Sequence, residues 1–259
     1  MSEKPSTLSV IRWLIERDLR TLVRSPFILI NRTIFFLIQL FIFAFLVSKL
    51  ASPSLGFNYF DFYSVGAVVS TITSIAFIIG EDLFEEEELG LLDYLLSLPF
   101  GHSLFVIGRA LGGAVRGLIY VTPMMVLVAY VDGNLSPAAV TGSLVVFFVL
   151  ATGISGLSIT LAMLIRNANR FDITIALAEL ATVRVSAAIY PLLYMPKVLQ
   201  PVAAYSPVTS ASDLVRAIIL PASYSSGAYD WVILLLFLGI FFGLGSAFLF
   251  RKIEGGKFD

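Results

Sequence analysis

Six long apolar segments constrain the fold of this chain more than any other feature of its sequence. They cover about residues 27–50, 59–80, 103–131, 137–165, 171–193 and 229–250. A helix needs about 20 mostly apolar residues to cross the hydrocarbon core of a bilayer. The composition agrees, because 58% of the residues are hydrophobic and 14% are charged, whereas soluble domains are about 45–50% apolar and about 25% charged. The sequence therefore predicts an all-α polytopic membrane protein in which residues 1–259 form a single transmembrane domain with six transmembrane helices.

The residue types that the sequence lacks exclude several kinds of site. There is no cysteine, so disulfides, iron–sulfur clusters and thiolate metal sites are impossible. The single histidine, His102, cannot form a histidine-rich metal site, and a net charge of −1 gives no basic surface for nucleic acid. We expect no catalytic centre, no metal or cofactor bound by this chain, and no nucleic-acid partner.

The first segment with helical periodicity, residues 9–25, is amphipathic. Apolar residues recur on one face and charged residues on another: Ile11, Ile15, Leu19 and Leu22 against Arg12, Glu16 and Arg20. Pro26 ends the segment, because the residue before a proline avoids the helical region. With Trp13 and several arginines just before a spanning segment, the pattern is typical of a helix that lies in the headgroup layer. An ordinary soluble helix is the alternative.

The distribution of the 17 lysines and arginines predicts the orientation in the membrane. Only Lys49, Lys197 and Arg216 fall on one side of the predicted spans, Arg184 falls inside the fifth span, and all the others fall on the opposite side. Because cytoplasmic loops are enriched in lysine and arginine, we expect both termini and residues 85–101 to be cytoplasmic. We expect a multi-pass protein of the cell (plasma) membrane.

Four prolines interrupt the apolar stretch between the fifth and sixth spans, at Pro191, Pro196, Pro201 and Pro207. A single straight helix cannot contain prolines at this spacing. Irregular backbone at membrane depth must be buried in protein or face water. We therefore predict two short re-entrant helices, at about 197–205 and 209–220, within an extracellular-side region at 194–221.

The cytoplasmic segment 85–101, EEEELGLLDYLLSLPFG, differs from everything around it. Its four carboxylates are typical of a solvated charge block. The leucines that follow predict a short helix with one apolar face: Leu91, Leu92, Leu95, Leu96 and Leu98. Such a face either binds a groove in another protein or packs against the cytoplasmic ends of the chain's own helices. Periodicity alone leaves both interpretations open.

Two segments together resemble the type-2 ATP-binding-cassette (ABC) permeases, the exporter-type membrane subunits. In GLLDYLLSLPFGHSLFVIGRAL and the residue pair before it, the positions that match are Glu88, Gly90, Leu91, Asp93, Leu95, Leu96, Ser97, Pro99 and Arg109. In SAAIYPLLYMPKVLQPVAAYSPVTSASDLVRAII, the positions that match are Ser186, Pro191, Pro196, Leu199, Pro207, Asp213 and Arg216. Leu92 and Ala187 depart from the family pattern. With the amphipathic start and six spans, the resemblance covers nearly the whole chain.

The resemblance implies a cytoplasmic coupling helix that docks on an ATPase subunit. The docking residues would be Glu88, Gly90, Leu91, Asp93, Tyr94, Leu95, Ser97 and Pro99. It also implies two ABC ATPase subunits, which bind ATP and Mg, and a second permease, either another copy or a paralogue. The translocation pathway would lie between the two permeases, bounded mainly by the first, second and fifth helices. The sequence contains no G-x-x-x-x-G-K-[ST] phosphate-binding loop, so ATP hydrolysis must come from a separate chain.

Polar residues inside the spans are candidates for the pathway. Glu179 and Arg184 lie in the fifth span, where charges are expensive and usually face a cavity or a partner. Ser70 and Ser74 lie in the second span and either line a path or bond to backbone carbonyls. An ion-coupled secondary transporter that uses Glu179 is the alternative function. An intramembrane enzyme is a third, but the sequence offers no nucleophile or acid–base cluster for it.

Overall fold

A computed structural model of the chain describes residues 6–24, 26–98, 101–131 and 134–254. Every regular element in these ranges is helical, which confirms the all-α class. The helices are α1 (Thr7–Arg24), α2 (Pro26–Gln39), the π-helix η1 (Leu40–Val47), α3 (Ser48–Leu55), α4 (Tyr59–Glu88), α5 (Leu91–Leu96), α6 (His102–Val131), α7 (Pro137–Leu164), α8 (Ala168–Arg184), the 3₁₀ helix η2 (Leu192–Tyr194), α9 (Gln200–Ala204), α10 (Pro207–Ile219) and α11 (Ala228–Glu254).

Four helices in the described part of the chain are long and apolar enough to cross a membrane. They are α4, α7 and the parts of α6 and α11 at Ser103–Val131 and Ala228–Leu249. These helices confirm that the protein is a polytopic membrane protein. Most of α4 is buried inside the protein, whereas most of α11 is exposed on its surface.

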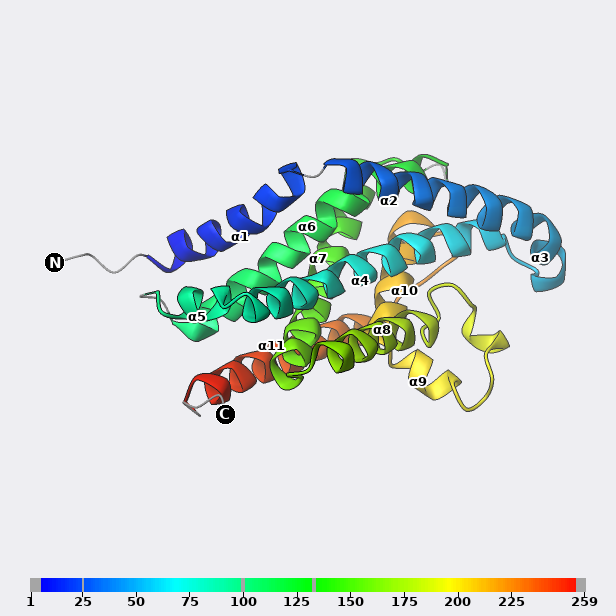
Figure 1. Cartoon of the computed structure of the whole chain (residues 1–259). Helices are drawn as coiled ribbons and strands as arrows, with labels where there is room; N and C mark the ends of the chain where they lie inside the picture. Colours follow the sequence, from blue (N-terminus) through cyan, green and yellow to red (C-terminus); the bar gives the residue numbers. More distant parts are fainter. Residues whose placement is uncertain (1–5, 25, 99–100, 132–133, 255–259) are drawn as a thin grey trace.

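The helix α7 lies at the centre of the bundle and packs against α4, α6 and α11 (Figure 1). Serine side chains bring α7 close to α4. Ser155 Oγ donates to Ala76 O at a distance of 3.3 Å. Ser158 Oγ donates to Phe77 O and accepts a hydrogen bond from Gly80 N at 3.1 Å. Small residues and interhelical hydrogen bonds are the usual means of packing helices in a membrane, where no hydrophobic effect drives them together.

The start of α1, the helix α5 and the end of α11 lie at one end of the molecule (Figure 1). The start of α4, together with α3 and α9, lies at the other end. The helix α5 and the start of α1 therefore lie at the same end of the bundle.

The second apolar segment continues further than its apolar pattern indicates. We expected it to end near residue 80, but α4 remains helical to Glu88. The carboxylates of Glu85–Glu88 therefore lie on the last turn of a long helix and not in a loop. The cause is that α4 packs along α6 and α7, so tertiary contacts keep the polar end helical.

The predicted end of the fifth segment, at residue 193, is wrong. The helix α8 has 17 residues and ends at Arg184, and it is followed by turns and by η2 at Leu192–Tyr194. At about 1.5 Å per residue, 17 residues rise only about 25 Å, which is less than the roughly 30 Å of a hydrocarbon core. The helix stops because the side chain of Ser186 bonds to Val183 O and the next carbonyls bond to Arg216.

The remaining predicted elements have helical counterparts in the structure. The helices α2, η1 and α3 follow one another through the first predicted segment and continue to Leu55. The amphipathic segment predicted at 9–25 corresponds to α1. The two short helices expected between residues 194 and 221 correspond to α9 and α10, although α9 has only five residues.

Candidate functional site

The helix α5 is set off from α4 by a sharp turn at Gly90. Leu89 N donates to Glu85 O at 3.0 Å, and Gly90 N donates to Glu87 O at 3.0 Å. These two bonds end α4. Gly90 has a φ of 71°, a left-handed conformation that glycine adopts without steric cost. The new helix begins at once, at Leu91. Gly90 thus allows a second short helix to leave the end of a spanning helix at a new angle.

The leucines of α5 lie on two faces and not on one. Leu92 and Leu95 are 2% and 5% exposed and belong to the hydrophobic core of the bundle. Leu91 and Tyr94 are 46% and 65% exposed, and the neighbouring Leu89 is 67% exposed. Packing against the chain's own helices therefore accounts for the inner face. The outer face presents apolar side chains that nothing in the described chain covers.

The residues expected to bind an ATPase divide in the same way. Glu88 and Ser97 are exposed, and Ser97 Oγ bonds back to Tyr94 O at 2.7 Å. Leu95 points inward, so it cannot contact another protein while α5 keeps this position. Pro99 and the side chain of Asp93 lie outside the described residues.

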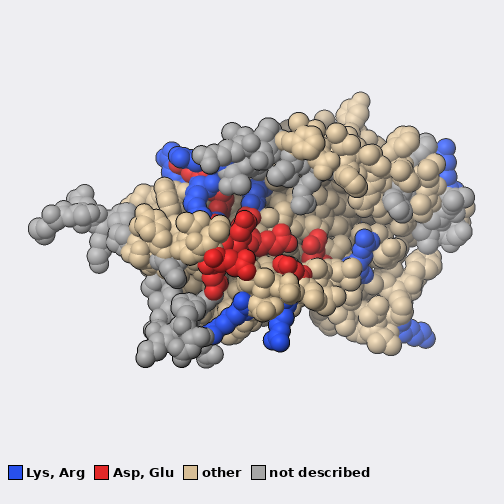
Figure 2. All heavy atoms as spheres, viewed as in Figure 1, with Lys and Arg blue, Asp and Glu red and all other residues tan. Residues whose placement is uncertain are grey.

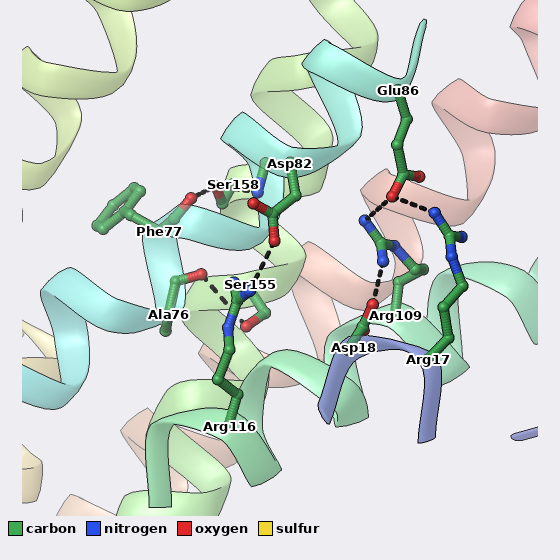
Figure 3. Close-up of polar contacts among 11 residues, drawn as sticks. Arg17, Asp18, Ala76, Phe77, Asp82, Glu86, Arg109, Arg116, Ser155 and Ser158 are labelled. Carbon is green, nitrogen blue, oxygen red and sulfur yellow. Dashed lines mark hydrogen bonds and ion pairs between the residues drawn. The ribbon is translucent and has the colours of Figure 1, made fainter. Parts of the chain in front are cut away.

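The carboxylates at the end of α4 are not only a solvated block. Figure 2 shows that Asp and Glu side chains gather on the face along which α4 runs. Glu85 and Glu88 are exposed. Asp82 and Glu86, however, point toward arginines on other helices (Figure 3).

Arg109 on α6 is the centre of an ionic junction (Figure 3). One guanidinium nitrogen binds Asp18 on α1, and the other binds Glu86 on α4 at 3.1 Å. Arg17, next to Asp18 on α1, binds the same oxygen of Glu86. The side chains of Arg109 and Asp18 are 1% and 4% exposed. Two cations and two anions from three helices therefore neutralise one another, with Arg109 and Asp18 buried and Arg17 and Glu86 half-buried. We call these four residues the ionic junction.

Burial shapes the electrostatics of the junction. Loss of solvent raises the pKa of Asp18 above its ordinary value, because the charged form is penalised, and the positive charges of Arg109, Arg116 and Arg17 oppose that rise. Several buried atoms have no partner in the described chain, among them Asp18 Oδ2, Glu86 Oε2 and Arg109 Nε. The pairs are therefore held by charge more than by complete hydrogen bonding.

A second ion pair joins α4 to α6 nearby. Arg116 Nη1 lies 2.7 Å from Asp82 Oδ2, with the two side chains 8% and 33% exposed. Arg116 and Arg109 are seven residues apart and thus lie on the same face of α6. The polar end of α4 is therefore bound to one face of α6 by two ion pairs, Glu86 with Arg109 and Asp82 with Arg116, about two turns of α6 apart.

On the other side of the bundle, Arg216 of α10 fixes the segment that follows α8. Its side chain is fully buried and donates to Ala187 O at 3.4 Å, Phe62 O at 3.2 Å and Ala188 O. It also binds Asp213 Oδ1 at 2.9 Å and lies 3.6 Å above the ring of Phe62. The distribution of lysines and arginines assigned Arg216 to the same side of the spans as Lys49 and Lys197, which stays a prediction. The structure shows that its side chain forms a buried clamp between α10, α4 and the segment after α8.

The candidate pathway residues do not form one cluster. Glu179 is half-buried and Arg184 is exposed, both on α8, and neither forms an ion pair within the described residues. Ser70 is buried and donates to Gly66 O of its own helix at 2.8 Å, which favours the backbone-bonding interpretation for this serine. Ser74 is half-buried.

Comparison with known proteins decides the family. The family model of the ABC-2 type transporter matches residues 9–220, a range that includes most of α1, the ionic junction, α5 and the clamp at Arg216. The chain belongs to the ABC-2 type transporter family. It is also 27% identical over 252 residues to the "Putative transport permease ycf38" of Cyanophora paradoxa, which covers 93% of this chain and 87% of that protein. The protein is thus a membrane transport permease, and this family in general works with ATPase subunits.

Sequence reasoning missed the ionic junction. Asp18 looks like one charge among many on an amphipathic helix, and Glu86 like one of four adjacent carboxylates. One signal was available, because Arg109 matches a basic position of the family pattern on a mostly apolar helix. A charge in such a helix usually has a partner, but the partner's identity depends on how α1, α4 and α6 meet.

Proposed function

We propose that this ABC-2 permease is the membrane-spanning subunit of an exporter, and that separate ATPase subunits drive it by binding α5. Six spans are proposed: α2 with η1 and α3, then α4, α6, α7, α8 together with the turns and η2 that follow it, and α11. The termini and α5 are cytoplasmic in this proposal. Two permeases form the translocation pathway between them, and two ATPases bind and hydrolyse ATP with Mg.

The observation that carries the proposal is the outer face of α5. Leu89, Leu91 and Tyr94 are exposed apolar side chains beside the exposed carboxylates Glu85 and Glu88. An apolar helix face outside the spanning region is stabilised when it fills a groove in another protein. The turn at Gly90 presents this face at the end of a helix that spans the bundle, so movement of a bound partner acts directly on α4.

In this proposal the movement of α5 passes from the second span, α4, to the fifth span, α8. The two helices contact each other. Phe84 and Phe171 stack with ring centroids 4.2 Å apart near the cytoplasmic end of both helices. Force applied at α5 therefore reaches α8 through α4. In our proposal this movement opens and closes the pathway, with Glu179, Arg184 and Ser74 as pathway residues.

The test is co-purification of the tagged chain with the ATPase encoded beside it, combined with the ATP turnover of the complex. Leu91→Asp with Tyr94→Asp places charge on the outer face of α5 without touching the core. A hot-spot side chain at the centre of an interface contributes at least about 2 kcal/mol, and an aromatic residue such as Tyr94 is typical of one, so we expect ATPase binding to weaken by roughly 30-fold or more. Leu135→Asp is the matched control, because Leu135 is 51% exposed but precedes α7.

Unchanged ATPase binding and turnover in the double variant would refute docking through α5. Leu95→Asp is a poorer test, since its side chain is buried and the change would disturb folding. Transport that follows a pH gradient without any ATPase, and that Glu179→Gln abolishes, would instead support the ion-coupled alternative.

A further inference from the structure

We propose that Arg109 is a positioning residue that makes α1, α6 and the end of α4 move as one unit. The helix α1 then follows α5 through the ATP cycle and is not an independent anchor at the membrane surface. This inference rests on the proposed function, because it assigns the path by which ATPase movement spreads from α5.

The geometry of Arg109 suits this role. Its two terminal nitrogens bind carboxylates from two different helices, Asp18 of α1 and Glu86 of α4 (Figure 3). A planar guanidinium fixes the direction of both bonds, which a lysine ammonium does not. If α1 separated from α6, buried charges would lose their partners, and an unpaired buried charge is strongly unfavourable. Separation of α1 or α4 from α6 would therefore break the ion pairs as well as the packing contacts.

The contact between α1 and α6 is close where the junction lies. An added Cβ at Gly112 would lie 2.2 Å from Asp18 Oδ2, which is too close for any side chain. One turn before Asp18, Leu14 is fully buried. The absence of a side chain at position 112 thus leaves the space that the Asp18 carboxylate occupies when it binds Arg109.

The position of Glu86 connects the junction to α5. Glu86 lies two residues before the end of α4 at Glu88, and α5 begins at Leu91. The inner face of α5 is also fixed to the bundle through Leu92 and Leu95. Movement of α5 is therefore transmitted to the end of α4, where Glu86 of the ionic junction lies within one helical turn of the last residue, Glu88.

The experiment measures whether α1 moves relative to the end of α4. The chain has no cysteine, so Leu8→Cys and Glu85→Cys take spin labels at two chosen places only. Both side chains are exposed, at the start of α1 and at the end of α4. Their separation is measured by pulsed electron paramagnetic resonance in the complex with the ATPase, without nucleotide and after trapping with ATP and vanadate. Labelled chain is diluted with unlabelled chain, so that only distances within one chain contribute.

With the junction intact, we expect one narrow distance distribution that is the same in both states. Asp18→Asn and Arg109→Gln should broaden or shift the distribution after trapping. Gly112→Ala keeps all four charges but displaces Asp18, so it should have the same effect and serves if the charge variants fail to fold. Glu16→Gln is the control, because it removes only the exposed pair with Arg12 on α1.

If Arg109 only stabilises the fold, its replacement will lower the unfolding temperature and leave the distance distribution narrow and equal in both states. That result overturns the inference. A shift in the unmodified junction upon trapping also overturns it. Loss of ATPase binding by the otherwise unmodified chain is a different outcome, since it refutes the proposed function itself and this inference with it.

Discussion

Replacement of Arg216 by methionine tests the clamp that ends α8. The change removes the donor for three carbonyl oxygens, those of Phe62, Ala187 and Ala188, and the partner of Asp213. Each lost hydrogen bond in a buried place destabilises by about 1 kcal/mol net. The loss at Asp213 is smaller than for a fully buried pair, because that side chain is 36% exposed. Together we expect a loss of about 3–5 kcal/mol.

Thermal unfolding in detergent measures this loss. For a chain of this size each kcal/mol corresponds to roughly 2–4 °C, so the midpoint should fall by about 6–20 °C. Arg184→Met is the matched control, because Arg184 is exposed on α8 and such changes usually stay within about 0.5 kcal/mol. Compared with Arg216→Met alone, the double variant Arg216→Met with Asp213→Leu should regain only the part of the stability that was lost because the Asp213 carboxylate had no partner. Equal midpoints for Arg216→Met and Arg184→Met would refute the clamp.

Two further predictions concern packing and pH. Gly80→Ala should destabilise by about 1–3 kcal/mol, because the new Cβ would lie 2.2 Å from Ser158 Oγ and 2.6 Å from Ser158 O. Gly239→Ala meets nothing within 4 Å and should be neutral or stabilise α11 by about 0.5–1 kcal/mol; thermal unfolding compares the two, and a neutral Gly80→Ala would contradict the close approach of α4 and α7. The raised pKa of Asp18 means that its carboxyl group binds a proton more tightly in the folded chain than in the unfolded chain. Protonation of Asp18 therefore stabilises the fold below the unfolded pKa of about 3.9, and this stabilisation is lost as pH rises through the folded pKa. The unfolding midpoint should therefore decline more steeply over this window with Asp18 than in Asp18→Asn, and parallel pH profiles would contradict this assignment.

Local patterns were sufficient for the class of the protein and for most helices. The apolar segment from residue 137 corresponds to α7, and the prolines between residues 191 and 207 correctly indicated broken backbone between α8 and α10. These features depend on composition and on backbone chemistry within a few residues. The end of α4 at Glu88 was missed because packing against α6 and α7 keeps a polar segment helical.

The candidate site was predictable only in part. The short helix after residue 90 was predicted from the sequence, whereas the turn at Gly90 that precedes it was not. Which leucines of that helix face outward does not follow from the sequence either, because the helix is too short for its periodicity to show where the bundle lies. Burial of Leu92 and Leu95, with Leu91 and Tyr94 outside, depends on how α5 rests on α4.

By itself the sequence determined that this chain crosses a membrane as a helical bundle, carries a short amphipathic helix after the second span, and contains no phosphate-binding loop. These properties follow from hydrophobic length, helical period and motif content, all of which are local. Only the tertiary structure decided that Arg17, Asp18, Glu86 and Arg109 form one ionic junction and that Arg216 holds the backbone after α8. The physical reason is that a charge in an apolar protein needs a partner, and the partner's place depends on contacts between segments that lie far apart in the chain.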